Sequence, residues 1–262
     1  MSAPVAGRLA VRLWFTPFPL GLGRGEGVTW ADETTSIGNA SVHRVGEGTR
    51  RALLVHGWAG SSRQFRRIAD GLVDAGFTVF MVDLPAHGSA SGTTTDVPQI
   101  AEALGDVASQ LGDFDLIVAH SLGAMATGVA LADTPLAADR LVFVAPGIKP
   151  RMMISKFVEE TGFSAEVEAA VAEEMESRFG KDVWDWVPAR SQALKPPSGS
   201  IVIHDIDDDR VPVEEGRALA DAWGVPIVET VGYGHNGVLR APETIDAIVN
   251  GVVFRTPAAR RG

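Results

Sequence analysis

The chain has 262 residues, of which 45% are hydrophobic and 21% are charged, and this composition excludes a disordered or fibrous protein. Single α/β domains commonly have about this length, so we expect one domain over residues 1–262. The net charge of −10 offers no positive field to a phosphate backbone, so nucleic acid is not an expected partner. The chain has no cysteine, which excludes disulfides, thiolate metal sites and a cysteine nucleophile.

The N-terminal segment does not resemble a secretory signal, because Arg8 and Arg12 interrupt its apolar residues. No apolar run reaches the roughly 18–20 residues that a membrane-spanning helix needs. We therefore expect a cytoplasmic protein without a membrane span. The glycine-rich run at 21–27 follows a proline-rich stretch and precedes a strand-like segment. A dinucleotide-binding loop lies between a strand and a helix, so we interpret this run as a surface connection.

From residue 51 onward, short apolar runs alternate with amphipathic helical segments. Continuous apolar strands between helices are typical of a parallel sheet covered on both faces, and we predict this α/β architecture. A segment at 41–45 is a candidate for an antiparallel strand before it. The predicted strands are 51–56, 78–83, 116–120, 141–146, 200–205 and 226–231, and the predicted helices are 63–75, 97–111, 122–132, 213–223 and 242–250.

This alternation is interrupted once, where a long segment takes the place of a single crossover helix. Apolar residues recur there every four positions with acidic residues between them, and a glycine follows where a helix would end: Val167, Val171, Met175, Phe179 and Gly180. A helical insertion at this point is either a lid over a site or a decoration at the edge of the fold. We expect a helical cap over residues 150–197.

The sharpest chemical signal is Ala119-His120-Ser121-Leu122-Gly123, which follows a predicted strand and opens a predicted helix. A serine in such a tight strand-to-helix turn has a strained backbone and needs small residues two positions before and after it. The turn lifts the hydroxyl above the sheet at a helix N-terminus, where a nucleophile is useful. Ala119 replaces the glycine that is usual at the first small position.

A second turn, His56-Gly57-Trp58-Ala59-Gly60, also follows a predicted strand directly. Such a turn can aim a backbone N–H at the same place as the amide of Leu122. Two converging N–H groups stabilise the oxyanion that forms during acyl transfer. We therefore expect Trp58 and Leu122 to supply an oxyanion hole, although glycines in this loop also serve tight turning.

Two further loops follow later strands and carry an acid and a base. One holds the aspartates at 205, 207, 208 and 209, and the other ends in His235. Loops at the carboxyl ends of parallel strands open on one edge of the sheet, so these groups should meet Ser121 there. The aspartate cluster lacks the glycine and glutamate that a calcium loop needs at its sixth and twelfth positions, so we expect no metal site.

Taken together, these motifs resemble the α/β-hydrolase superfamily over roughly residues 50–255. The matching segments are HGWAG at 56–60, DLPAHG at 83–88, AHSLG at 119–123, DDRVP at 208–212 and GYGH at 232–235. The resemblance implies an eight-stranded, mostly parallel sheet, a Ser-His-Asp triad, no cofactor, and a cap after the strand at 141–146. It selects Asp208 as the acid from its DxxVP turn. It also implies that Asp83 and His87 organise a loop, and that His120 packs beside the nucleophile.

We therefore expect a carboxylesterase-like serine hydrolase that cleaves small or medium acyl esters. Ser121 would attack the carbonyl, His235 would transfer the proton, and Asp208 would orient the imidazole. Thioesterase, amidase, lactonase and perhydrolase activities use the same triad, and a non-catalytic ligand-binding member would keep the pocket, so these alternatives stay open. The sequence does not indicate an oligomeric state. Candidate pocket residues, each equally able to pack between cap and sheet, are Met152, Met153, Phe157, Trp184 and Trp186.

Overall fold

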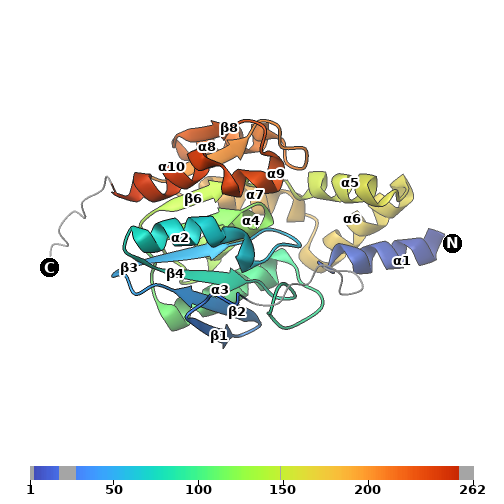
Figure 1. The fold of residues 1–262 in the computed structure, drawn as a ribbon. Coiled ribbons are helices and arrows are strands. Elements are labelled where there is room, and N and C mark those ends of the chain that lie inside the picture. Colours follow the sequence, from blue (N-terminus) through green and yellow to red (C-terminus); the bar gives the residue numbers. More distant parts are fainter. Residues whose placement is uncertain (1–2, 18–27, 148, 254–262) are drawn as a thin grey trace.

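The computed structural model describes residues 3–17, 28–147 and 149–253 (Figure 1), so the glycine-rich run at 21–27 lies outside the described residues. An eight-stranded sheet has the order β1-β2-β4-β3-β5-β6-β7-β8. Strands β1 (Glu33–Ile37) and β2 (Ala40–Val45) form an antiparallel hairpin that pairs with β4. The parallel strands are β3 (Arg50–Val55), β4 (Phe77–Asp83), β5 (Leu116–His120), β6 (Leu141–Val144), β7 (Ile201–Asp205) and β8 (Ile227–Thr230).

Helices cover both faces of this sheet, as the continuous apolar strands predict. Alternate residues of β3 show the reason, because Leu53 packs into one apolar core and Leu54 into the other. Helices α3 (Val97–Leu111), α4 (Leu122–Asp133) and α8 (Val213–Trp223) bury their apolar sides in the first core. The 3₁₀ turn η2 (Ser62–Phe65), α2 (Arg66–Asp74), the short α9 (Gly234–Gly237) with η3 (Val238–Arg240), and α10 (Pro242–Val253) lie on the second face.

Three helices fill the interruption between β6 and β7: α5 (Pro150–Thr161), α6 (Ala165–Phe179) and α7 (Val183–Ala193). Gly180 ends α6 with a φ of 89°, the left-handed region that glycine tolerates best. A separate apolar cluster, which includes Ile154, Val167 and Val171, holds this insertion together. In Figure 1 α5 and α6 project from one end of the sheet.

Strand β1 and helix α1 (Ala3–Trp14) are among the elements that the sequence pattern did not predict. Strand β1 is largely exposed and polar, so it lacks the apolar alternation that marks a strand. Helix α1 packs against α6 and buries Ala10 in the cluster of the insertion. No helix in the described parts of the chain is long and apolar enough to cross a membrane.

Candidate active site

Ser121 occupies a strained turn between β5 and α4, with φ 55° and ψ −124°. Left-handed φ values are costly for residues with a side chain, and such strain is typical of functional turns. Two glycines make the turn fit. A Cβ on Gly123 would lie 2.2 Å from the backbone oxygen of His56, and a Cβ on Gly57 would lie 2.8 Å from Ser121 Cβ. The small residues of the motif are therefore required by close backbone packing.

A chain of two short hydrogen bonds joins Ser121 to His235 and Asp208. His235 Nδ1 lies 2.7 Å from Asp208 Oδ2, and His235 Nε2 lies 2.8 Å from Ser121 Oγ. An ionised carboxylate only accepts, so Nδ1 carries the hydrogen and donates it. Nε2 of the neutral ring is then the acceptor for the serine hydroxyl. Ser121 and His235 are each only 7% exposed, which keeps the pair nearly free of competing water.

Asp208 is fixed by contacts on both oxygens. Its Oδ1 accepts hydrogen bonds of 2.9 Å from the backbone N–H groups of Arg210 and Val211. Nε2 of His204, which donates to the Val211 carbonyl, lies 3.3 Å from Oδ2. Burial raises the pKa of Asp208, but hydrogen bonds from His204 and His235 outweigh it and lower the pKa below its ordinary value. Asp208 therefore stays ionised beside the imidazole.

The neighbouring aspartates hold the loop that carries His235, a role that sequence reasoning missed. Asp205 is fully buried at the end of β7, and its carboxylate also accepts from the Thr230 hydroxyl at 2.7 Å. Asp209, in contrast, is exposed. Consecutive backbone N–H groups of the histidine loop donate to these carboxylates: Gly232 to Asp207 Oδ2 at 2.9 Å, Tyr233 to Asp205 Oδ2 at 3.2 Å, and Gly234 to Asp205 Oδ1 at 3.0 Å. The only sequence signal was a carboxylate directly at a strand end.

The loop after β3, which contains Trp58, is tied to the loop after β4. His87 Nδ1 donates to its own loop at the Pro85 carbonyl, which leaves Nε2 to accept from the N–H of Ala59 at 3.1 Å. Asp83 accepts from the backbone and hydroxyl of Ser62 at 2.8 and 2.6 Å. These contacts agree with a loop-organising role for both residues. Trp58 and Leu122 line the same cavity as Ser121.

As the first residue of α4, Leu122 has a backbone N–H without an acceptor in its own helix. The adjacent His120 is buried, with only 1% of its surface exposed. Its Nε2 donates to the backbone oxygen of His235 at 2.9 Å, and burial together with the nearby His235 lowers its pKa to about 3. His120 therefore remains neutral and supports the His235 backbone.

A cavity of about 230 Å³ opens over Ser121. Met153 and Phe157 of α5 line it, as expected, but Met152 and Trp184 do not. Trp184 packs elsewhere, because its indole N–H donates to Glu176 at 2.8 Å and the Arg151 guanidinium covers its ring. The side chain of Trp186 lies outside what the structure describes. Lining residues that the sequence did not indicate include Trp14, Phe15, Gln64, Thr95, Asp96, Val97, Met125, Met175, Phe179 and Val211.

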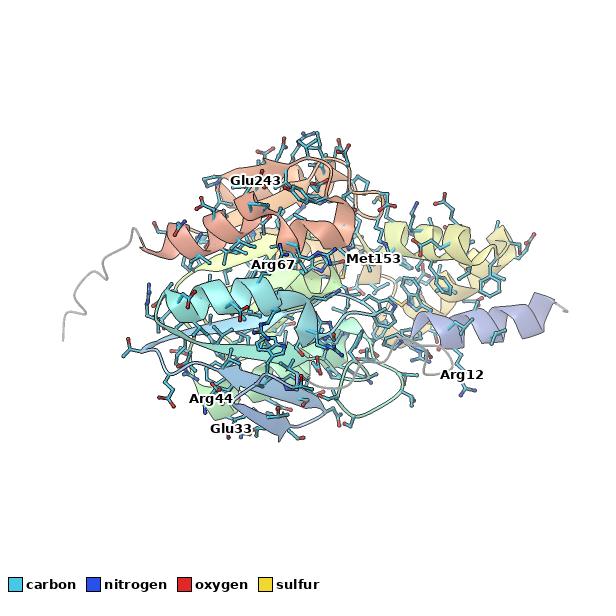
Figure 2. All side chains as sticks on the ribbon, in the orientation of Figure 1. Arg12, Glu33, Arg44, Arg67, Met153 and Glu243 are labelled. Atoms are coloured by element: carbon cyan, nitrogen blue, oxygen red, sulfur yellow. The ribbon has the colours of Figure 1, made fainter. Side chains whose placement is uncertain are left out.

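The last residue of α1, Trp14, and the following residue, Phe15, both line the cavity. Trp14 meets Phe157 edge to face with ring centroids 5.4 Å apart, and Phe15 lies 6.4 Å from Phe179. Figure 2 labels Met153 of α5 near the place where the helical insertion meets the rest of the fold. Within residues 3–17, 28–147 and 149–253, no group of three or more histidine or acidic side chains is arranged to hold a metal ion.

Comparisons with known proteins agree with this architecture. A sequence family described as the alpha/beta hydrolase fold matches residues 53–166. A bromoperoxidase from Bacillus anthracis superposes with a TM-score of 0.64 at 17% identity, covering 84% of this chain and 99% of that chain. A putative lipase from Acinetobacter baumannii gives 0.59 at 17% identity, covering 97% and 95%. The thioesterase domain from the curacin biosynthetic pathway gives 0.60 at 14% identity, covering 84% and 97%. The chain therefore has the α/β-hydrolase fold.

Proposed function

We propose that this protein is a serine hydrolase that cleaves carboxylic esters with small or medium acyl groups. The observation that carries the proposal is the pair of hydrogen bonds from Asp208 through His235 to Ser121, at 2.7 and 2.8 Å. A serine hydroxyl is a weak nucleophile unless a base takes its proton, and a neutral imidazole whose Nε2 carries no hydrogen is such a base. The family match and the neighbours titled as a lipase and a thioesterase support hydrolase activity.

In the first half of the proposed reaction, Ser121 Oγ attacks the ester carbonyl while His235 Nε2 takes its proton. The backbone N–H groups of Trp58 and Leu122 bind the oxyanion that forms on the carbonyl oxygen. The negative charge of Asp208 stabilises the resulting imidazolium. The C–O bond to the alcohol then breaks, His235 returns the proton to the departing oxygen, and the acyl group stays on Ser121.

The second half of the reaction repeats these steps with water. His235 takes a proton from the water as its oxygen attacks the acyl carbonyl, and the collapse of the intermediate returns the proton to Ser121 Oγ. The products are a carboxylic acid and the regenerated serine, so no cofactor enters the balance.

The cavity and the insertion support esters as substrates of modest size. Aromatic and methionine side chains dominate the lining, including Trp14, Phe157 and Met153, which suits an apolar acyl group. We propose that residues 150–197, together with α1, form the cap over this cavity. p-Nitrophenyl esters of increasing acyl-chain length test the expected size of the substrate, and kcat/KM should peak at short or medium chains. A faster reaction with matched thioesters or amides would contradict the ester assignment.

A fluorophosphonate probe tests the proposed nucleophile, because it labels only serines that an adjacent base activates. The wild-type protein should be labelled at Ser121, and Ser121→Ala should lose both labelling and nearly all ester hydrolysis. Ser109→Ala is the matched control, since its hydroxyl is on the outer side of α3 and donates to the Gly105 carbonyl. Unchanged labelling in Ser121→Ala, or no labelling of the wild type, would refute the proposal and favour a non-catalytic binding protein.

A further inference from the structure

The cavity over Ser121 has a neighbour, a groove that lies between α3 and α4 and is open to solvent. Glu102 of α3 and Asp133 of α4 are exposed residues of its lining. Among the described residues, Pro98 and Phe179 line both the cavity and the groove. The two spaces therefore share a wall, to which α3 contributes a proline ring and α6 contributes an aromatic ring.

The aromatic part of this wall is packed in place. Phe179 is the last residue of α6, and its ring centroid lies 6.4 Å from that of Phe15, with 60° between the ring planes. Phe15 is only 5% exposed, and its carbonyl accepts from the backbone N–H of Thr95 at 3.0 Å. The Arg178 guanidinium covers the Phe15 ring at 4.3 Å. The ring of Phe179 is therefore backed by a fixed neighbour just after the end of α1.

The proline part of the wall is held by the start of a helix. Pro98 lies in the first turn of α3, and its ring fixes its own backbone φ angle. The N-cap of this helix, Asp96, accepts from the backbone N–H of Gln99 at 2.9 Å, which secures the turn. Phe179 is therefore the part of the wall that a single substitution can remove without disturbing a helix start.

The position of the wall relative to His235 indicates which part of an ester would face it. In the proposed reaction His235 gives a proton to the departing oxygen, so the alcohol lies on the His235 side of Ser121. His235 leads into η3, which packs on the second face of the sheet. Helices α3 and α4 pack on the first face. In this arrangement the acyl chain points away from His235 and extends toward Pro98 and Phe179.

We propose that Phe179 sets the upper limit of acyl length in this enzyme, because its ring closes the cavity toward the groove. This inference rests on the proposed function of the same site. Burial of one methylene group can raise kcat/KM by about fourfold, which corresponds to roughly 0.8 kcal/mol. A chain that reaches the ring gains nothing from further methylene groups. In a protein without the ring, a longer chain would pass Pro98 and enter the groove.

The test compares p-nitrophenyl dodecanoate with p-nitrophenyl butyrate in the wild type and in Phe179→Ala. The ratio of their kcat/KM values should rise at least about tenfold in the variant, which corresponds to about two newly buried methylene groups. This ratio does not depend on the fraction of folded protein, because both esters report on the same active molecules. Phe179→Leu keeps part of the side chain and should give an intermediate ratio, so it serves as a second variant if alanine prevents folding.

Phe157→Ala is the matched comparison. It removes the same kind of side chain from another helix of the insertion, and Phe157 lines the cavity but is not among the residues of the groove. The cavity then grows but stays closed, so the ratio should rise by no more than about fourfold, the gain from one methylene group. A series of alkyl acetates tests the direction of the chain. Phe179→Ala should leave the preferred alcohol length unchanged, because the alcohol lies on the other side of Ser121.

The inference is overturned if the ratio is unchanged in both Phe179 variants, if Phe157→Ala raises it as much, or if the gain appears with the alkyl acetates instead. Ser121-dependent hydrolysis of p-nitrophenyl butyrate by the wild type would then show that the proposed function stands without this length limit. Failure of the wild type to cleave any of these esters would reject the proposed function itself.

Discussion

Replacing Asp208 with asparagine should greatly slow ester hydrolysis, although asparagine has the same number of heavy atoms and nearly the same shape. Asp208 Oδ1 accepts from two backbone N–H groups at 2.9 Å, so the asparagine oxygen must take this position. The amide nitrogen then occupies the place of Oδ2 and faces His235 Nδ1 as a donor. The imidazole can satisfy it only with Nδ1 unprotonated and Nε2 protonated, and that tautomer cannot take the proton of Ser121.

The expected loss follows from this reversed tautomer together with the missing negative charge beside the imidazolium. A change of this kind lowers kcat by roughly 10³–10⁴ near neutral pH. The assay is p-nitrophenyl butyrate hydrolysis, with circular dichroism to confirm that the variant folds. Asp209→Asn is the control, because it makes the same change at the exposed neighbouring residue and should cost less than about tenfold. More than a tenth of wild-type kcat in Asp208→Asn, or a larger loss in Asp209→Asn, would refute the assignment.

Three other perturbations have expected outcomes. Asp205→Asn turns an amide donor toward N–H and hydroxyl donors, so it should lower the free energy of unfolding by about 1–3 kcal/mol. It should also lower kcat more than it changes KM, because Asp205 holds the loop that carries His235. A wild-type kcat in this variant would contradict that role of Asp205. Trp14→Ala should shift the acyl-length preference of p-nitrophenyl esters, while Trp30→Ala, outside the cavity, should not; equal effects would reject a binding role for α1. Burial lowers the pKa of His120 to about 3, so between about pH 6.5 and 3 the unfolded chain binds more protons than the folded chain, and stability falls as pH falls. In His120→Gln, the free energy of unfolding, measured by urea unfolding at several pH values, should fall less steeply with pH, by up to about 1.4 kcal/mol per pH unit. An unchanged pH dependence of this free energy would contradict the prediction.

The parallel core was predictable from the sequence because its strands are buried on both faces. Residues 116–119 form a continuous apolar run that ends at His120, and the structure places β5 over residues 116–120, with all five buried. Strand β1 was not predictable in this way, because three of its five residues are exposed and its pairing depends on the hairpin with β2. The N-terminal helix α1 was missed because its packing partner, α6, lies far along the chain.

The convergence of Ser121, Asp208 and His235 followed from one topological rule, since loops after parallel strands share an edge of the sheet. Their catalytic roles remain predictions that the experiments above address. The cavity lining was harder to foresee. Met152 and Met153 are neighbours on α5, and a helix turns about 100° per residue, so only tertiary packing decides which one faces Ser121.

The most direct test of the central claim is to look for the acyl group on Ser121 during turnover. Wild-type protein is mixed with p-nitrophenyl butyrate, quenched in acid within milliseconds, digested and examined by mass spectrometry. The proposed mechanism predicts a butyryl group on the peptide that contains Ser121, present during turnover and gone after the substrate is exhausted. Steady hydrolysis with no acyl group on Ser121, or with the acyl group on a different residue, would contradict it.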